Sequence, residues 1–146
     1  MRLTILTIAI AMIAISGCTG GKKIAPPYEV KAKKGILLDQ GVMLYIVTEG
    51  KGAKPAVTDE LKVNYHGMLE DGTVFDSSFD RGEPNVFPLN RLIKGWQIGL
   101  VEVPEGSKVR LVIPPAAAYG DQAKPSIPPG STLIFDIELI SIESKS

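Results

Sequence analysis

The chain has 146 residues and a net charge of zero, which leaves room for one domain with a hydrophobic core and not for a second. Its single cysteine excludes an intrachain disulfide, so the fold must be stabilised by its core. Residues 19–35 carry five basic residues against one acidic, and residues 36–146 carry ten against fifteen, so the acidic main part of the chain is unsuited to nucleic acid and we expect no such partner.

The N-terminus has the order of charge and apolar residues that is typical of an export signal. Arg2 is followed by an uncharged apolar run, residues 3–15, which is shorter than the roughly 20 residues that a membrane-spanning helix needs. The run ends in Ile15-Ser16-Gly17-Cys18, which resembles the bacterial lipobox, whose cysteine is lipidated and becomes the first residue of the mature protein. We therefore predict a signal peptide at residues 1–17 and lipidation of Cys18. A free thiol, or ordinary signal-peptide cleavage nearby, is the alternative.

The predicted location follows from this lipid anchor. We expect the protein in the cell envelope, on the periplasmic face of the outer membrane if the cell has one and otherwise on the outer face of the plasma membrane. Thr19 is not the Asp associated with inner-membrane retention in some bacteria, so by analogy the outer membrane is favoured.

Residues 18–40 are predicted to be the lipidated Cys and a flexible basic tether, because Gly20-Gly21, Pro26-Pro27 and several lysines occur there without a sustained period. The lysines could contact anionic head groups, or the segment could be a solvated linker. It contains no long amphipathic pattern that would make a dimerisation arm, so we expect a monomer.

The folded domain is expected at residues 41–146, and it begins with strand patterns. Residues 42–47 are apolar and β-branched and lie between glycines, which favours a strand. Residues 61–69 alternate, with His66 on the polar face, so we predict a strand with one buried face and a solvent-exposed His66. Asp71-Gly72 predicts a hairpin turn into a return strand at residues 73–75.

The second half of the domain adds one helix and two strands. Residues 76–84 are polar with Gly and Pro and predict an irregular loop rather than a helix. Residues 89–101 carry apolar side chains near the spacing of an amphipathic helix, with the only Trp of the chain, Trp96, on that stripe. Strands are expected at residues 108–113 and 132–142, with a loop between them. The sum is an α+β domain of five or six antiparallel strands and one short helix.

Aromatic residues are the strongest candidates for a site. With a single His and no further Cys, a Cys–His nucleophile and a structural zinc site are excluded, and neither a phosphate-binding Gly-rich loop nor HExxH is present. If the helix packs on the sheet, aromatic side chains from separate strands and loops can meet Trp96 in an apolar cup. The alternative is that Trp96 is ordinary core. The aromatic residues concerned are Tyr65, Phe75, Phe87, Tyr119 and Phe135.

Several motifs, in order along residues 41–143, closely resemble the FKBP-type peptidyl-prolyl cis-trans isomerases. The resemblance implies a strongly bent antiparallel sheet wrapped around the helix, with the substrate pocket between them. It also implies proline-containing polypeptides as substrates, macrolide inhibitors as further ligands, and neither cofactor nor metal. The motifs are Val63-Asn64-Tyr65-His66-Gly67-Met68-Leu69-Glu70-Asp71-Gly72, Val74-Phe75-Asp76-Ser77-Ser78, Ile93-Lys94-Gly95-Trp96, Ala118-Tyr119-Gly120, Ile127-Pro128-Pro129 and residues 133–139.

The resemblance also implies roles for individual residues. Asp76, Tyr119 and Trp96 take the catalytic positions, with Trp96 as the pocket floor, and Arg81 takes the position that orients the site. The chain departs from the family at Asn85, where many members have an aromatic residue, and at Lys124, where some have a His. The implied substrate-binding residues are Tyr65, Phe75, Phe87, Leu92, Ile93, Ile127 and Phe135, and the Ile93 N–H would bond a ligand carbonyl.

The sequence therefore predicts a prolyl isomerase of exported proteins that works by desolvation in an apolar pocket. A non-catalytic peptide-binding module or chaperone that uses the same pocket is the alternative. The loop between residues 114 and 129 is too short for the inserted chaperone domain of some relatives, which favours the enzyme.

Overall fold

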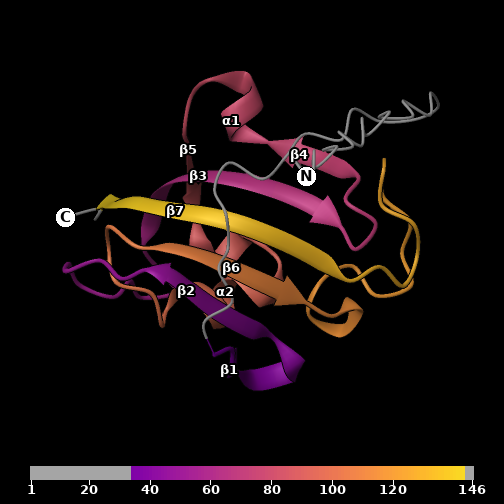
Figure 1. The fold of residues 1–146 in the computed structure, drawn as a ribbon, viewed down its shortest axis with the longest axis horizontal. Helices are drawn as coiled ribbons and strands as arrows, with labels where there is room; N and C mark the ends of the chain where they lie inside the picture. Colours follow the sequence, from indigo (N-terminus) through magenta and orange to yellow (C-terminus); the bar gives the residue numbers. More distant parts are fainter. Residues whose placement is uncertain (1–33, 144–146) are drawn as a thin grey trace, which may run out of the picture.

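A single antiparallel sheet forms most of the domain (Figure 1). The structure is a computed structural model and describes residues 34–143. The strand order is β1-β2-β6-β7-β3-β4, and β5 pairs with the outer side of β3. The predicted α+β class is confirmed. The strands are β1 (Ile36–Leu37), β2 (Met43–Thr48), β3 (Glu60–Leu69), β4 (Val74–Ser77), β5 (Asn85–Pro88), β6 (Lys108–Ile113) and β7 (Leu133–Glu143).

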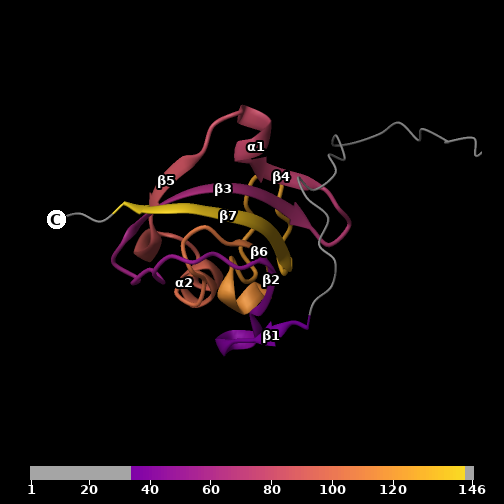
Figure 2. The same ribbon diagram turned by 60° about the vertical axis from the view of Figure 1, so that its left-hand side comes forward.

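The sheet curves around the helix α2 (Lys94–Leu100), which lies on its concave side (Figure 2). The alternating patterns expected for residues 61–69, 108–113 and 132–142 are confirmed, because one apolar face of each of β3, β6 and β7 points inward, with residues such as Leu61, Leu111 and Ile137 buried. Together with Trp96 and Leu100 of α2 they form one core. The helix therefore fills much of the concave face. A pocket lies at the N-terminal end of α2, beside Ile93 and Trp96.

The helix is shorter than the sequence pattern predicted. Residues 89–101 are not one helix: a 3-10 turn, η2 (Leu89–Arg91), is followed by extended backbone at Leu92 and Ile93, and α2 begins only at Lys94. The Leu89 N–H donates to the backbone oxygen of Asp59, which holds this turn against the start of β3. Leu89 is fully buried. Its apolar character is therefore explained by its position in the core, and a continuous helix is not needed to account for it.

Glycines allow α2 to lie directly on the sheet. A Cβ atom at Gly95 would overlap the side chain of Ile113, and one at Gly99 would overlap that of Leu111, both on β6. Glycine destabilises a helix by about 1 kcal/mol relative to Ala, and the close packing of α2 on β6 offsets this cost. This contact fixes the height of Trp96 above the sheet.

The prediction that His66 is solvent-exposed is wrong. The His66 side chain is 1% exposed, and its Nδ1 lies 3.1 Å from the Ser77 hydroxyl oxygen. The register places His66 opposite Ser77 on one side and Asp136 on the other. Asp136 is likewise fully buried, and it accepts hydrogen bonds from Arg110 Nε at 2.6 Å and Nη2 at 2.8 Å. Alternation along a strand shows which side a residue faces and does not show what covers that side.

The polar stretch after β4 is more ordered than predicted. Residues 76–84 do not form an irregular loop throughout: β4 continues to Ser77, and a one-turn helix, α1 (Ser78–Arg81), follows. The Ser77 hydroxyl accepts the Asp80 N–H at 3.3 Å, which caps the turn, and Gly82 ends it with a φ of 79°. Ser77 and Gly82 are the residues in the sequence that indicate this helical turn. The short strand β5, which comes next, was also missed.

The fold begins before residue 41. β1 pairs with β2 through Ile36 and Leu37, and a 3-10 turn, η1 (Asp39–Gly41), joins the two strands. The tether was predicted to end at residue 40, which is about five residues too late, because the prediction included the apolar residues Ile36 and Leu37 in it. The signal peptide, Cys18 and the rest of the tether lie outside the described residues.

A tight turn in the loop after β6 holds Ile127 in place. Lys124 and Ile127 exchange two backbone hydrogen bonds of 3.0 and 2.9 Å, with Pro125 and Ser126 between them. Ser126 has a φ of 66°, in the left-handed region that favours glycine. The backbone at Ser126 is therefore strained, and the hydrogen bonds around it maintain the conformation.

Replacing Ser126 by Gly should raise the free energy of unfolding by about 1 kcal/mol, since glycine adopts a positive φ without the steric penalty. For a domain of this size the melting temperature should rise by about 4 °C. Thermal unfolding followed by circular dichroism measures this, with Ser131→Gly in the same loop as the control. A fall in melting temperature for Ser126→Gly would contradict the inferred strain.

Candidate active site

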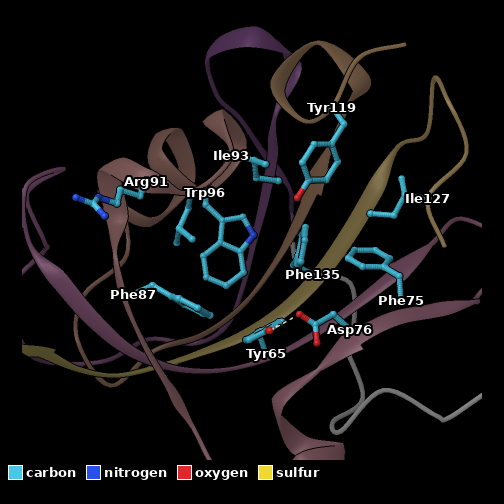
Figure 3. A pocket seen from close by; sticks show the side chains of 11 residues that line it. Tyr65, Phe75, Asp76, Phe87, Arg91, Ile93, Trp96, Tyr119, Ile127 and Phe135 are labelled. Atoms are coloured by element: carbon cyan, nitrogen blue, oxygen red, sulfur yellow. Dashed lines mark hydrogen bonds between the residues drawn. The ribbon is translucent and has the colours of Figure 1, made fainter. Parts of the chain in front are cut away.

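A pocket of about 310 Å³ opens between the N-terminal end of α2, the strands β3, β4, β5 and β7, and the loop after β6 (Figure 3). Every side chain that the sequence assigned to catalysis or substrate binding lines it. Arg81 does not line the pocket, and Arg91 lines it although the sequence analysis missed it. The lining residues are Tyr65, Phe75, Asp76, Phe87, Arg91, Leu92, Ile93, Trp96, Tyr119, Ile127 and Phe135.

The aromatic side chains meet edge to face and form a rigid floor and wall. Trp96 is 4% exposed, and its ring lies 5.2 Å from Phe135 at 84° and 5.6 Å from Tyr65 at 81°. Phe75 meets Phe135 at 5.5 Å and 85°, and Phe87 closes the other side 6.4 Å from Trp96. Edge-to-face contacts are the preferred geometry of aromatic pairs. Trp96 is thus both core and pocket floor, so the two alternatives left open by the sequence are both true.

A glycine beneath the wall makes this packing possible. A Cβ atom at Gly67 of β3 would lie 2.8 Å from Phe75 and 2.9 Å from Phe135, closer than real Cβ contacts. Gly67 pairs with Phe135 on β7 and Asp76 on β4, so it lies directly under the site. Any larger residue there would push the two rings into the pocket.

One side of the pocket carries a linked set of polar groups. The Tyr65 hydroxyl donates to Asp76 Oδ2, and Arg81 Nη1 donates to Asp76 Oδ1 at 2.5 Å. Arg81 Nη2 donates to the Tyr65 hydroxyl oxygen at 3.0 Å and to Asn85 Oδ1 at 2.7 Å. Arg81 therefore contacts both Asp76 and Tyr65 although it does not itself line the pocket. Both carboxylate oxygens of Asp76 are occupied, so Asp76 is poorly placed to take a proton from a ligand.

Tyr65 and Arg81 keep one protonation state each around neutral pH. Burial and the hydrogen bond to Asp76 raise the pKa of Tyr65 above its ordinary value of 10. Hydrogen bonds to Tyr65 and Asp76 raise the pKa of Arg81 further above its already high range. Tyr65 therefore remains a neutral hydroxyl and Arg81 a cation around neutral pH.

Two further hydrogen-bond donors belong to residues that line the other side of the pocket, Tyr119 and Ile93. Figure 3 shows the Tyr119 hydroxyl directed into the pocket, across from Asp76. The Ile93 N–H has no backbone acceptor within residues 34–143, because the chain is extended at Ile93 just before α2 begins. Lys124 Nζ lies 5.4 Å from the centre of the Tyr119 ring, which holds this side chain against the loop. A bound carbonyl could therefore be held by one backbone and one side-chain donor.

Arg91 adds a cation at the edge of the pocket. It is exposed and lies in η2, directly before the extended residues Leu92 and Ile93, where the sequence pattern had predicted the polar side of a longer helix. Only the break in that helix brings Arg91 to the pocket, so periodicity could not have found it.

In the part of the chain that the structure describes, no three His, Cys, Asp or Glu side chains are grouped to hold a metal ion. No helix between residues 34 and 143 has the length and apolar character to span a membrane.

Residues 51–140 match the family of FKBP-type peptidyl-prolyl cis-trans isomerases. The chain is 48% identical over 112 residues to the isomerase FkpA of Aeromonas hydrophila, covering 76% of this chain and 42% of that protein. It is 50% identical over 105 residues to the 22 kDa FKBP-type isomerase of Escherichia coli K12, covering 71% of this chain and 51% of that one. It thus spans about half the length of these curated relatives.

The fold agrees with this sequence match. The crystal structure of FkpA from Escherichia coli superposes with a TM-score of 0.73 at 45% identity, covering 77% of this chain and 53% of that one. The curved sheet around one short helix is therefore a fold that this chain shares with that structure. The chain belongs to the FKBP-type peptidyl-prolyl cis-trans isomerases.

Proposed function

We propose that this chain catalyses the cis–trans isomerisation of X–Pro bonds in other polypeptides, in the pocket above Trp96. The observation that supports this most directly is the enclosure of a 310 Å³ hollow by aromatic side chains, with donors at its edge and no nucleophile in it. A proline ring has the size and apolar character to lie on Trp96, with the packed rings of Phe75 and Phe135 forming the wall beside it. The reaction makes and breaks no covalent bond, so the missing nucleophile is no obstacle.

The pocket lowers the rotation barrier by binding the twisted amide better than the planar one. The barrier of about 20 kcal/mol arises because twisting removes the resonance of the amide. A twisted amide is less polar than a planar one, so transfer from water to the apolar pocket disfavours the planar state more strongly. The Ile93 N–H and the Tyr119 hydroxyl would hold the substrate carbonyls and so orient the bond.

A peptide assay tests the proposal and separates it from the alternative of a binding module. Short peptides with a Leu-Pro bond are prepared rich in the cis form, and the relaxation to equilibrium is followed by NMR exchange spectroscopy or by a protease that cleaves only the trans form. The first-order rate should rise linearly with protein concentration. A protein that binds the peptide but leaves the relaxation rate unchanged would be a binding module, and the proposal of catalysis would fail.

Peptides should be turned over faster with Leu before proline than with Glu. The walls next to the pocket floor are apolar, including Phe87, Ile93 and Ile127. Burying part of a leucine side chain there contributes roughly 1 kcal/mol that glutamate cannot supply, which corresponds to about a fivefold difference in kcat/KM. The same assay on paired peptides measures the ratio. Equal rates would remove the apolar-wall argument and leave the catalytic proposal in place.

We also propose that the protein is anchored in the cell envelope through a lipid on Cys18, where it would act on exported polypeptides. The support is the order Arg2, apolar run and Ile15-Ser16-Gly17-Cys18 in the sequence. Radioactive palmitate fed to expressing cells should label the wild-type protein and not Cys18→Ser. A wild-type protein without an acyl chain would refute the anchor, and with it the proposed outer-membrane location.

A further inference from the structure

The guanidinium of Arg81 is held from three directions by groups on three different strands. Asp76 of β4 accepts from Nη1, while Tyr65 of β3 and Asn85 of β5 both accept from Nη2, at 3.0 and 2.7 Å. The Arg81 carbon Cζ also lies 5.7 Å from the centre of the Tyr65 ring. Asn85 is the one partner of the three that does not line the pocket.

The orientation of the Asn85 amide follows from chemistry. A guanidinium has only donors, so the group that faces Nη2 must be the amide oxygen and not the amide nitrogen. Asn85 is the first residue of β5 and pairs in register with Val63 of β3. Its backbone is therefore fixed by the sheet, and its side chain can act as a stationary acceptor.

Arg81 needs such an acceptor because its own backbone position does not fix its long side chain. It is the last residue of α1, whose backbone is attached to β3 through Ser78, since the Tyr65 N–H donates to the Ser78 hydroxyl at 2.8 Å. The Arg81 side chain is nevertheless 43% exposed and could adopt many rotamers in water. Its ion pair with Asp76 lies at an exposed site and contributes little. Asn85 adds a third acceptor, on a third strand, to Asp76 and Tyr65, and so narrows the orientations of the guanidinium.

We propose that Asn85 is a positioning residue of the isomerase pocket, whose side-chain oxygen holds the Arg81 guanidinium in the orientation that fixes Asp76 and the Tyr65 hydroxyl. This rests on the proposed isomerase function. Asn85 touches no substrate; it acts through Arg81. Its effect should fall on the arrangement of Asp76 and Tyr65 in the transition state and not on the affinity for peptide.

Replacing Asn85 by Ala should lower kcat about threefold to fivefold, the size expected for losing one hydrogen bond to a charged group at a partly exposed site. KM and the melting temperature should stay close to wild type. Asn85→Asp keeps an oxygen in the same place and should restore most of kcat. Asn90→Ala is the matched control: Asn90 is exposed, lies nearby in η2, and neither lines this pocket nor contacts Arg81 through its side chain.

A double-mutant cycle shows whether Asn85 acts through Arg81. In an Arg81→Met background, Asn85→Ala should have no further effect on kcat, because the group that Asn85 holds is gone. Independent losses that multiply, or a wild-type kcat for Asn85→Ala in a folded protein, would overturn the proposal. A loss in Asn90→Ala as large as in Asn85→Ala would also overturn it. If the wild-type protein itself shows no isomerase activity, the proposed function fails instead.

Discussion

Replacing Arg110 by Ala is expected to lower the free energy of unfolding by about 3–5 kcal/mol, the usual cost of leaving a buried charge without its partner. The Asp136 side chain is fully buried between β6 and β3, while that of Arg110 is 24% exposed. Arg110 on β6 donates two hydrogen bonds to the carboxylate of Asp136 on β7. Without Arg110, the carboxylate would remain in a place that water does not reach.

The reverse substitution should cost less, and this asymmetry is the sharper test. In Asp136→Ala the partly exposed guanidinium of Arg110 can turn to water, so we expect a loss of about 1–2 kcal/mol. The double variant should be more stable than Arg110→Ala alone, because the buried charge is then absent. Urea unfolding of the three variants measures these differences. Equal losses in the two single variants, or a double variant weaker than both, would show that the buried carboxylate is not the cause.

Asp76→Ala and Tyr119→Phe should each lower kcat/KM roughly tenfold, about 1.4 kcal/mol, with little change in melting temperature. Neither side chain is part of the buried core, in contrast to Trp96 and Phe135, whose replacement would combine lost activity with cavity formation. The losses should be moderate, because desolvation uses no nucleophile or obligatory base and much larger losses belong to covalent triads. Rates are measured in the peptide assay and stability by thermal unfolding.

Two substitutions of the same chemistry outside the pocket are the controls. Asp80→Ala removes an exposed carboxylate from α1, and Tyr45→Phe removes a hydroxyl from β2. Neither residue lines the pocket, so both variants should keep wild-type rates. If either control lost as much activity as its pocket counterpart, the named roles of Asp76 and Tyr119 would be wrong.

The rate should also be independent of pH around neutrality. Raised pKa values keep Tyr65 as a neutral hydroxyl and Arg81 as a cation well above pH 7. The only His of the chain, His66, follows Tyr65 in β3 and so points to the opposite face of the sheet. A bell-shaped profile centred near pH 7, or complete inactivation of folded Tyr119→Phe, would show that a proton transfer takes part.

The sequence alone determined the inward faces of the strands and the set of aromatic pocket residues. Alternation in β3, β6 and β7 separates the two faces of each strand with a period of two, and a strand cannot change this without turning over. The motifs around Tyr65, Phe75 and Trp96 then identified the pocket residues, all of which the structure brings together. The local sequence pattern was sufficient for these features, because the backbone of a strand fixes the direction in which each side chain points.

The tertiary structure alone decided what covers each face and where the helix begins. His66 and Asp136 alternate as polar residues should, and only the register across four strands shows that Ser77 and Arg110 lie beside them. The break before Lys94 is accompanied by the hydrogen bond between Leu89 and Asp59, two residues that are far apart in the sequence. The Asn85–Arg81 bond likewise joins elements whose relative position is set by pairing with β3. Such contacts depend on packing between distant segments, and the period of one segment carries no information about its neighbours.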